Sequence, residues 1–384
     1  MSHAHRVNLL LCTLVSTLGL SAGYSAETVE IAPLAKAINA IGPQGAGHRE
    51  AMAAWAQLAQ VEAARLPEVL AGMDQANRLS VNWLRGAVET IAQRQLDRGD
   101  PLPVAALEVF LADTSHAPLA RRTAYELILS VDPTAKTRLI AAMLNDPSLE
   151  LRREAVALAL ADAGRLRADG PRADATAAFR TAFTAARDLD QIREASRQLR
   201  SLGEQVDLPR HFGFLMQWQL VAPFDNTNMS GLDVAYGPEV KLDLAASYPG
   251  KNATIAWIPH TTQDDYGVVD LNKALGKHKA AVAYAYAEFL ADRPRDVELR
   301  LGCITANKLW LNGELLTTNN VYHSGTQIDQ YVSRGRLRAG QNVILVKICQ
   351  NDQTEPWAQN WQFQLRVCDT IGTAILSTDR QPLP

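Results

Sequence analysis

Residues 218–226 read WQLVAPFDN, and they mark the point where the character of the chain changes. The apolar run from Trp218 to Val221 is typical of a β-strand, Pro223 is expected to end it, and the Asp-Asn pair favours a turn. Before this stretch the sequence is rich in Ala, Leu and Arg at helical spacing, and after it come short alternating segments. The sequence therefore predicts a multidomain chain, with an α-helical half followed by an antiparallel β-sandwich.

Length and composition fit an ordinary globular protein of two domains. The chain has 384 residues, of which 47% are hydrophobic and 21% charged, so it can bury sizeable cores. Its formal net charge is -3. Because nucleic-acid-binding proteins usually carry a basic excess, we expect no nucleic-acid partner.

The first residues have the pattern of a signal peptide. Arg6 supplies a positive charge, residues 7–20 are mostly apolar, and small residues follow as far as Ala26. The apolar run is too short to span a bilayer, and no later stretch is long and apolar enough. We expect residues 1–26 to be removed, and the protein to be exported to the periplasm or secreted, without a transmembrane segment. A buried first helix is the alternative.

Cysteine usage fits export. Cys12 falls in the leading segment, where Leu11 stands in place of the small residue that lipid attachment needs. Cys303, Cys349 and Cys368 fall in or beside expected strands, so they form at most one intramolecular disulfide. Three buried apolar thiols are the simpler interpretation, and the sequence leaves the pairing open. No Cys-x-x-Cys occurs, which excludes a zinc ribbon.

An internal repeat organises the helical half. The motif LRGAV at residues 84–88 recurs as RRTAY, RREAV and IREAS, with its alanine at Ala87, Ala124, Ala155 and Ala195. These alanines are 37, 31 and 40 residues apart, a spacing typical of stacked helix pairs. A small residue lets paired helices approach closely, while the neighbouring arginines are expected at the solvent edge. An irregular helical bundle is the alternative.

Residues 146–156, DPSLELRREAV, resemble a HEAT repeat, and the other copies of the motif are degenerate. The resemblance covers roughly residues 48–205 and implies an α-solenoid with a concave face that docks proteins. A short polar linker follows at residues 207–209. We therefore expect a HEAT-like domain at residues 27–208 and a second domain at residues 209–384.

The second half alternates like a set of short strands. Strands are expected at residues 239–244, 254–258, 281–290, 297–304, 308–311, 343–348 and 361–367. Asn312 and Gly313 separate two strands, and Asn-Gly is the strongest short signal for a hairpin. It predicts a type I′ turn, in which both residues have positive φ.

Residues 309–314, LWLNGE, and residues 337–346, LRAGQNVILV, together resemble the galactose-binding-like jelly roll. That fold occurs in carbohydrate-binding modules and as the sugar-binding sandwich of some β-glycosidases. The resemblance covers about residues 212–376 and implies recognition of a carbohydrate or glycoconjugate. Other members of the fold are structural modules, so the fold alone does not imply sugar binding.

The first candidates for ligand contact lie in a polar loop at residues 352–359. Trp357 lies off the alternating pattern, and an exposed ring there would stack on a sugar face. Glu355, Gln359 and Asn360 would then bond hydroxyl groups beside the ring. The alternative is that Trp357 folds back and anchors the loop.

A second candidate place is the segment around Tyr266, which we interpret as a rim residue together with Asp264. The remaining tryptophans of the sandwich lie in expected strands and are interpreted as core residues; these are Trp218, Trp257, Trp310 and Trp361.

Metal binding and catalysis find little support. Asp225, Asn226 and Asn228 offer oxygen ligands for a structural calcium ion, but a capped turn explains them more simply. No His-Glu-x-x-His, Gly-x-Ser-x-Gly, Walker loop or dinucleotide fingerprint occurs. We therefore assign no catalytic residue, expect no other cofactor, and do not expect an enzyme.

Together these features predict an exported, non-enzymatic binding protein that recognises a carbohydrate or glycoconjugate through its sandwich. The alternative is a structural or protein-interaction scaffold that uses the helical solenoid, and a hydrolase accessory protein comes third.

Overall fold

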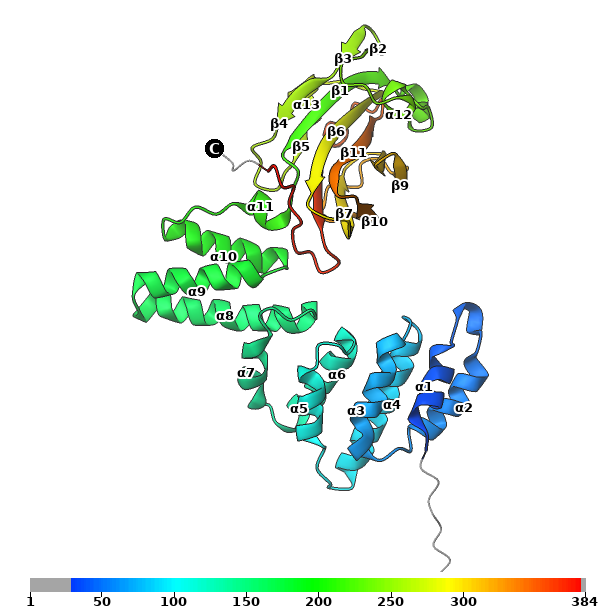
Figure 1. Cartoon of the computed structure of the whole chain (residues 1–384), viewed down its shortest axis with the longest axis vertical. Coiled ribbons are helices and arrows are strands. Elements are labelled where there is room, and N and C mark those ends of the chain that lie inside the picture. The colour runs from blue at the N-terminus through cyan, green and yellow to red at the C-terminus, as the bar shows by residue number, and fades with distance from the viewer. Residues whose placement is uncertain (1–28, 381–384) are drawn as a thin grey trace, which may run out of the picture. The chain divides into compact units, whose positions relative to one another are not determined.

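The structure is a computed structural model in which residues 29–380 are described (Figure 1). These residues form two compact units that divide between Ile128 and Leu129. The expected leading segment, residues 1–26, lies outside the described residues. The expected domain limit at residues 208–209 falls at the start of the last helix before the first strand, and it stays a prediction.

The described part of the first unit consists of helices joined by short turns. The helices are α1 (Ile31–Asn39), α2 (His48–Leu58), α3 (Leu66–Ala71), α4 (Ser80–Asp97), α5 (Val104–Ala112) and α6 (Pro118–Val131), with 3₁₀ turns at Pro43–Gly45, Ala63–Arg65 and Gly72–Gln75. The second unit opens with the last residues of α6 and continues with α7 (Ala135–Ile140), α8 (Leu149–Asp169), α9 (Arg172–Ala185), α10 (Leu189–Ser201) and α11 (Leu208–Phe212), with a 3₁₀ turn, η4, at Ala141–Met143. No helix within residues 29–380 has the length and apolar character needed to cross a bilayer.

The repeat alanines are buried, as the pattern predicts. Ala87 in α4, Ala124 in α6, Ala155 in α8 and Ala195 in α10 are each at most 1% exposed. A methyl group takes little room, so each of these helices can approach its neighbours closely at that position.

The expectation that the repeat arginines stay at the solvent edge is wrong for Arg121 and Arg152, which are 1% and 5% exposed. The Nε atom of Arg121 donates to the carbonyl of Leu111 near the end of α5, at 2.8 Å. Arg152 Nε donates to the carbonyl of Asp146, before α8, at 2.7 Å. Helix ends and turns leave carbonyls without partners, and a buried guanidinium satisfies them.

The strands of the second unit follow its first helices. They are β1 (Gln217–Asp225), β2 (Ser247–Pro249), β3 (Thr254–Ala256), β4 (Ile258–Thr261), β5 (Val269–Asp270), β6 (Ala281–Ala291), β7 (Arg295–Cys303), β8 (Asn307–Leu311), β9 (Glu314–Asn319), β10 (Tyr331–Leu337), β11 (Gly340–Gln350) and β12 (Gln362–Cys368). Short helices between them are η5 (Thr227–Leu232), α12 (Gly237–Val240), α13 (Leu271–Leu275) and η6 (Pro356–Ala358).

Antiparallel pairing joins these strands into two main sheets and a small hairpin. One sheet has the order β4-β1-β6-β11-β8-β9, the other has the order β10-β7-β12-β5, and β2 pairs with β3. The two main sheets share one apolar core, which includes Leu220, Ala285, Leu299, Val346 and Leu365. Figure 1 shows β6 and β11 running side by side through the larger sheet. Helices followed by an antiparallel β-sandwich are therefore confirmed.

The outer face of the six-stranded sheet is also covered. Tyr284 of β6 and Leu345 of β11 pack there against Leu232, Tyr248 and Trp257. These covering residues come from the segment between β1 and β4, which contains η5, α12, β2 and β3. The central strands are therefore buried on both faces.

Residues 239–244 do not form a strand, contrary to expectation. Pro238 lies in the first turn of the short helix α12, which extends to Val240, so this segment begins as a helix. Val240 is 75% exposed and Leu244 is 39% exposed. The apolar alternation there does not mark a buried sheet face, because the segment lies over the sheet without joining it.

β1 also differs from expectation, because it continues past Pro223 as far as Asp225. Its pairing with β6 shifts register between Val221 and Phe224. A proline has no N–H to donate, so it interrupts the ladder, and the strand resumes after this irregularity.

The hairpin between β8 and β9 is confirmed. Asn312 has φ 52° and Gly313 has φ 84°, the signs that a type I′ turn requires. The Asn312 side chain donates to Asn342 Oδ1 at 2.9 Å and accepts from the Val343 N–H at 3.0 Å. The Asn-Gly turn is therefore tied directly to the start of β11.

The sandwich contains three free, buried cysteines. Burial raises the pKa of Cys303 to about 11, of Cys349 to about 12 and of Cys368 to about 11. They are therefore the buried apolar thiols that the simpler interpretation predicts.

Candidate ligand-binding pocket

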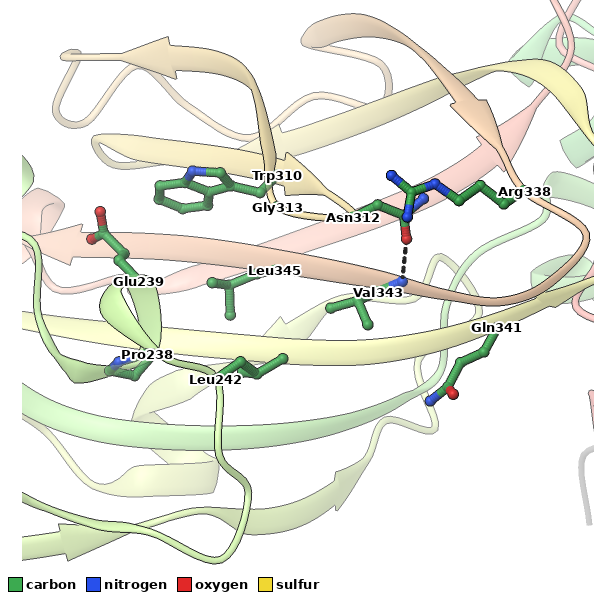
Figure 2. Close-up of a pocket in the computed structure, with 10 residues that line it drawn as sticks. All are labelled: Pro238, Glu239, Leu242, Trp310, Asn312, Gly313, Arg338, Gln341, Val343 and Leu345. Atoms are coloured by element: carbon green, nitrogen blue, oxygen red, sulfur yellow. Dashed lines mark hydrogen bonds between the residues drawn. The ribbon is translucent and has the colours of Figure 1, made fainter.

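A pocket of about 480 Å³ opens on the outer face of the six-stranded sheet (Figure 2). Val343 and Leu345 of β11 contribute apolar side chains to it, Trp310 of β8 lies on one side, and Pro238 and Leu242 on another. Pockets for small molecules usually measure roughly 300–1,000 Å³ and combine an apolar lining with a few placed polar groups. The size and lining of this pocket fit that class.

Trp310 was expected in the core, and that expectation is wrong. Its neighbours Leu309 and Leu311 face the core between the sheets, so the alternation of β8 turns Trp310 to the outer face. There the indole is only partly buried, packs against the outer-face cluster that includes Leu345, and lines the pocket. Residues at alternate positions of a strand face opposite sides, so two inward leucines on either side of Trp310 were the sequence signal for its outward direction. By contrast, Trp218, Trp257 and Trp361 are buried, as expected.

Glu239 of α12 lines one end of the pocket and pairs with a buried lysine. Its Oε1 accepts from Lys347 Nζ at 2.7 Å and also from the hydroxyl of Tyr284. The Lys347 ammonium donates further to the carbonyls of Leu232 at 3.0 Å and Val234 at 2.8 Å. With three acceptors for its three protons, the ammonium is fully satisfied. A lone lysine inside the apolar strand VILVKIC was the sequence signal for this pair, and sequence reasoning missed it.

Burial is the main cause of the pKa shifts at the Glu239 end of the pocket. The Lys347 side chain is 0% exposed, and burial lowers its pKa, while the hydrogen bond to Glu239 opposes that shift. Burial first, and the hydrogen bond to Glu239 second, raise the pKa of Tyr284 well above its usual range. The Glu239 carboxylate is therefore held in place as a fixed acceptor beside the apolar lining.

The opposite end of the pocket carries groups of another kind. Figure 2 shows Arg338 close to Asn312, at the end away from Glu239. Arg338 and Gln341 are exposed, and the Arg338 guanidinium makes no hydrogen bond to any described residue. The pocket thus places a carboxylate at one end, hydrogen-bond donors at the other, and an indole with aliphatic side chains between them.

The predicted loop site around Trp357 lies elsewhere. Trp357 is 59% exposed in η6, and its ring meets His323 edge to face at 5.2 Å. Gln359 Nε2 turns back onto its own loop and donates to the carbonyls of Thr354 at 2.6 Å and Glu355 at 2.9 Å.

The other two loop residues predicted to contact a ligand have exposed side chains. Glu355 and Asn360 are exposed, and the Asn360 carbonyl accepts from Gln350 Nε2 at 3.3 Å. An exposed ring with a carboxylate near it in sequence is therefore present, and ligand contact at this loop stays a prediction.

Tyr266 and Asp264 are not joined to that loop. The Tyr266 hydroxyl accepts from Arg193 Nε of α10 at 3.1 Å, and the ring lines a different pocket, which includes none of residues 355–360. Asp264 Oδ1 accepts from the N–H of Tyr266 at 2.8 Å and of Val268 at 3.3 Å, so it caps a turn. The structure thus separates the predicted site residues into two groups.

Two of the candidate calcium ligands, Asp225 and Asn226, are bonded within the protein, and Asn228 is exposed. Asp225 Oδ1 accepts from the Thr227 hydroxyl at 2.7 Å and lies 3.3 Å from Lys251 Nζ. The buried Asn226 amide bonds the Gln350 carbonyl at 2.9 Å and accepts from the Gly231 N–H at 2.9 Å. These contacts are those of a capped turn. Within residues 29–380, no cluster of three His, Cys, Asp or Glu side chains could hold a metal ion.

Comparisons with known proteins give only distant likeness. No family model matches the chain, and no curated protein matches it. Similar solved structures include a beta-glucosidase from Kluyveromyces marxianus in complex with glucose, with 15% identity and TM-score 0.24 over 39% of this chain and 16% of that one. A Ruminococcus gnavus beta-glucuronidase matches with 13% identity and TM-score 0.24, over 40% of this chain and 28% of that one.

An anti-sigma factor domain-containing protein from Clostridium clariflavum matches with 8% identity and TM-score 0.24, over 44% of this chain and 49% of that one. The chain thus spans less than half the length of each of these three proteins.

Proposed function

We propose that this chain is an exported, non-enzymatic protein that binds a carbohydrate or glycoconjugate in the pocket beside Trp310. The observation that carries the proposal is the arrangement of that pocket, with an indole and aliphatic side chains between polar groups at both ends. A sugar ring has an apolar face and a rim of hydroxyl groups. Trp310 would stack on the face, while Glu239 accepts from hydroxyl groups and Arg338 and Gln341 bond those at the other end.

A binding role fits the chemistry of the pocket better than catalysis. Among the described residues that line it, Glu239 alone carries a carboxylate, and its Oε1 is held by Lys347 and Tyr284. Glycoside hydrolysis needs two carboxylates on opposite sides of the scissile bond. The same pocket therefore supports recognition without cleavage.

We also propose that the helices are HEAT-like repeats, that the sandwich is a galactose-binding-like jelly roll, and that the chain is exported. The buried alanines of the helices support HEAT-like repeats, and the type I′ turn tied to β11 supports a galactose-binding-like jelly roll. Export rests on the sequence pattern of residues 1–26. Sequencing the N-terminus of protein recovered from outside the cytoplasm tests it, and an intact Met1 on that protein would contradict removal of the segment.

Glycan-array screening of the full chain, followed by titration calorimetry with the best sugar, tests the binding site. Trp310→Leu keeps an apolar side chain but removes the stacking surface, and Gln341→Ala changes an exposed rim residue. We expect Trp310→Leu to weaken binding at least about tenfold, because contact with a large aromatic ring contributes roughly 1.5–3 kcal/mol. Gln341→Ala should weaken binding by a smaller factor.

Trp357→Ala is the matched control, since it removes the other partly or fully exposed indole of the sandwich. It should leave affinity unchanged if the pocket beside Trp310 is the site. Lost binding in Trp357→Ala with normal binding in Trp310→Leu would move the site to the loop predicted from the sequence. Absence of any bound glycan would contradict the carbohydrate function itself.

A protein-interaction scaffold is the second candidate. The helices of the first unit expose some large apolar side chains, among them Met52 at 54% and Val109 at 74%. Affinity purification with wild-type bait and with Val109→Ser tests this role, and a partner lost in the variant would support it.

A further inference from the structure

A second pocket, of about 620 Å³, lies on the outer face of the four-stranded sheet. Gln362, Gln364 and Arg366 project into it from β12, and Arg193 of α10 and Tyr266 line it from other elements. Its lining is therefore richer in amide and guanidinium groups than the pocket beside Trp310.

Gln364 is the most unusual group in this pocket. Its side chain is 3% exposed, yet its amide makes no hydrogen bond to any described residue. The oxygen and nitrogen of this amide keep some contact with solvent, since neither atom is fully enclosed. An amide that keeps some contact with solvent and has no protein partner is therefore available to bond a ligand in the pocket.

Glycine at position 302 makes room for that amide. A Cβ atom on Gly302 would lie 3.0 Å from Gln364 Nε2 and 2.5 Å from the carbonyl of Gln327. Both of these contacts are shorter than ordinary van der Waals distance. A side chain at position 302 would therefore displace the Gln364 amide from its place in the pocket.

The carboxylates of this pocket are already neutralised. Asp329 is held by Arg366, with Nε at 2.6 Å and Nη2 at 2.5 Å, and by Arg300 at 2.8 Å. Asp188 lies 3.1 Å from Arg153. Neither carboxylate is therefore left to balance the remaining arginines.

Two arginines of the lining, Arg187 and Arg193, form no ion pair with the described residues. Arg193 is exposed, donates through Nε to Tyr266, and lies over that ring at 5.3 Å, so its two terminal nitrogens are available to a ligand. Arg187 bonds backbone carbonyls such as that of Ala186 at 2.8 Å. Burial, and then the nearby Arg152, lower the pKa of Arg187 to about 10, while Asp369 opposes the shift.

We propose that this pocket is a second binding site, for a small hydroxylated molecule that carries a carboxylate or phosphate group. The oxyanion binds the terminal nitrogens of Arg193, and a hydroxyl group bonds the Gln364 amide. Charge-assisted bonds from a guanidinium to an oxyanion supply the larger part of the affinity. The site is separate from the sugar pocket and does not depend on the function proposed for it.

Titration calorimetry on the full chain tests the site with three probes, namely gluconate, inorganic phosphate and sorbitol. Gluconate carries a carboxylate on a hydroxylated chain, and sorbitol is its uncharged counterpart. We expect gluconate to bind at millimolar concentration or below, phosphate more weakly and sorbitol not at all. If neither anion binds, or sorbitol binds as well as gluconate, the proposal is overturned.

Variants then locate the bound probe. Arg193→Gln should weaken gluconate binding about tenfold, since it removes a charged donor at an exposed helix position. Arg197→Gln is the matched control, because Arg197 is an exposed arginine of the same helix that does not line the pocket. Equal affinity in these two variants would contradict the site.

Gln364→Glu provides a second check on the same site. This change keeps the size of the side chain and adds a negative charge, so it should abolish gluconate binding while melting curves verify folding. Trp310→Leu should leave gluconate binding unchanged. Loss of gluconate binding in Trp310→Leu alone would assign the anion to the first pocket and overturn the second.

Discussion

The helical repeats and the sandwich both bury cations, and in both regions these cations donate to backbone carbonyls. In the helices, the buried Arg121 and Arg152 donate to backbone carbonyls. In the sandwich, the buried Lys347 bonds two carbonyls and the carboxylate of Glu239. Helix ends supply free carbonyls wherever a repeat turns, whereas a central strand has already used its own. A cation in the sheet therefore needs a covering segment and a counter-charge.

The largest effect should come from breaking the buried pair in the sandwich. Glu239→Gln leaves the Lys347 ammonium without a counter-charge at 0% exposure. We expect a loss of about 3–5 kcal/mol in the free energy of unfolding, as for other buried pairs that lose one partner. Urea denaturation followed by tryptophan fluorescence measures it. Glu314→Gln, at an exposed position of β9, is the control and should change stability by less than about 0.5 kcal/mol. A similarly small loss in Glu239→Gln would contradict the comparison.

A pH effect should arise at α11, between the two kinds of structure. Burial, and then Arg187, lower the pKa of His211 to about 4 from the ordinary value of 6.5. Between these values the unfolded chain binds a proton that the folded chain does not. The His211 contribution is therefore fully present above pH 6.5 and is lost as pH falls toward 4, by up to about 3 kcal/mol.

His211→Phe isolates that contribution, because a phenyl ring can keep the tilted ring contact that His211 makes with Phe183 at 4.3 Å between centroids. Denaturation of wild type and variant at a series of pH values measures the difference. The variant should lose less stability between pH 6.5 and pH 4. Parallel curves for the two proteins would show that His211 binds a proton as readily in the folded state as in the unfolded chain.

A smaller effect is expected for a buried arginine of the repeats. Arg152→Met removes a charged hydrogen bond to the carbonyl of Asp146 and should cost about 1.5–3 kcal/mol. Arg153→Met is the matched control at the next residue, where the exposed guanidinium pairs with Asp190 at 2.6 Å. Such surface pairs contribute at most about 1 kcal/mol. Equal losses in the two variants, by urea denaturation, would remove the distinction between buried and exposed repeat arginines.

The smallest effects should have opposite signs in the two regions. Gly313→Ala places a side chain at φ 84° in the hairpin turn, with no atom within 4 Å, so backbone strain alone should cost about 1 kcal/mol. Gly164→Ala, in the interior of α8, also meets no atom within 4 Å, and it should stabilise the protein by about 0.5–1 kcal/mol. Differential scanning calorimetry measures both changes. Shifts of the same sign would contradict the assignment of these effects to backbone conformation.

The sequence predicted periodic features well, because one residue type recurs where one environment recurs. The repeat alanines were placed correctly for that reason, and the Asn-Gly hairpin was placed correctly because its turn type depends on two adjacent residues. The burial of Arg152 was not predicted, because the position of its acceptor, the Asp146 carbonyl, depends on how the preceding turn closes. Residues 239–244 had the pattern of a strand but cover a sheet face, and composition does not distinguish those two uses of apolar residues.

The candidate pocket was harder to predict because it is built from distant parts of the chain. Glu239, Trp310 and Gln341 line one pocket only when the segment between β1 and β4 lies over β8 and β11. Trp357 was easier to single out because exposure in a polar loop is a local property. The alternation of β8 does carry the outward direction of Trp310, but a pocket also needs the covering segment.

The buried cysteines make the order in which the sheets open measurable without any engineered label. A thiol with a raised pKa that is shielded from solvent reacts with an alkylating reagent only after its surroundings open. Cys349 lies in β11 of the larger sheet, while Cys303 and Cys368 lie in β7 and β12 of the smaller one. Mass spectrometry of alkylation over time would thus give a separate opening rate for each sheet. Faster modification of Cys303 and Cys368 than of Cys349 would identify the four-stranded sheet as the one that opens first.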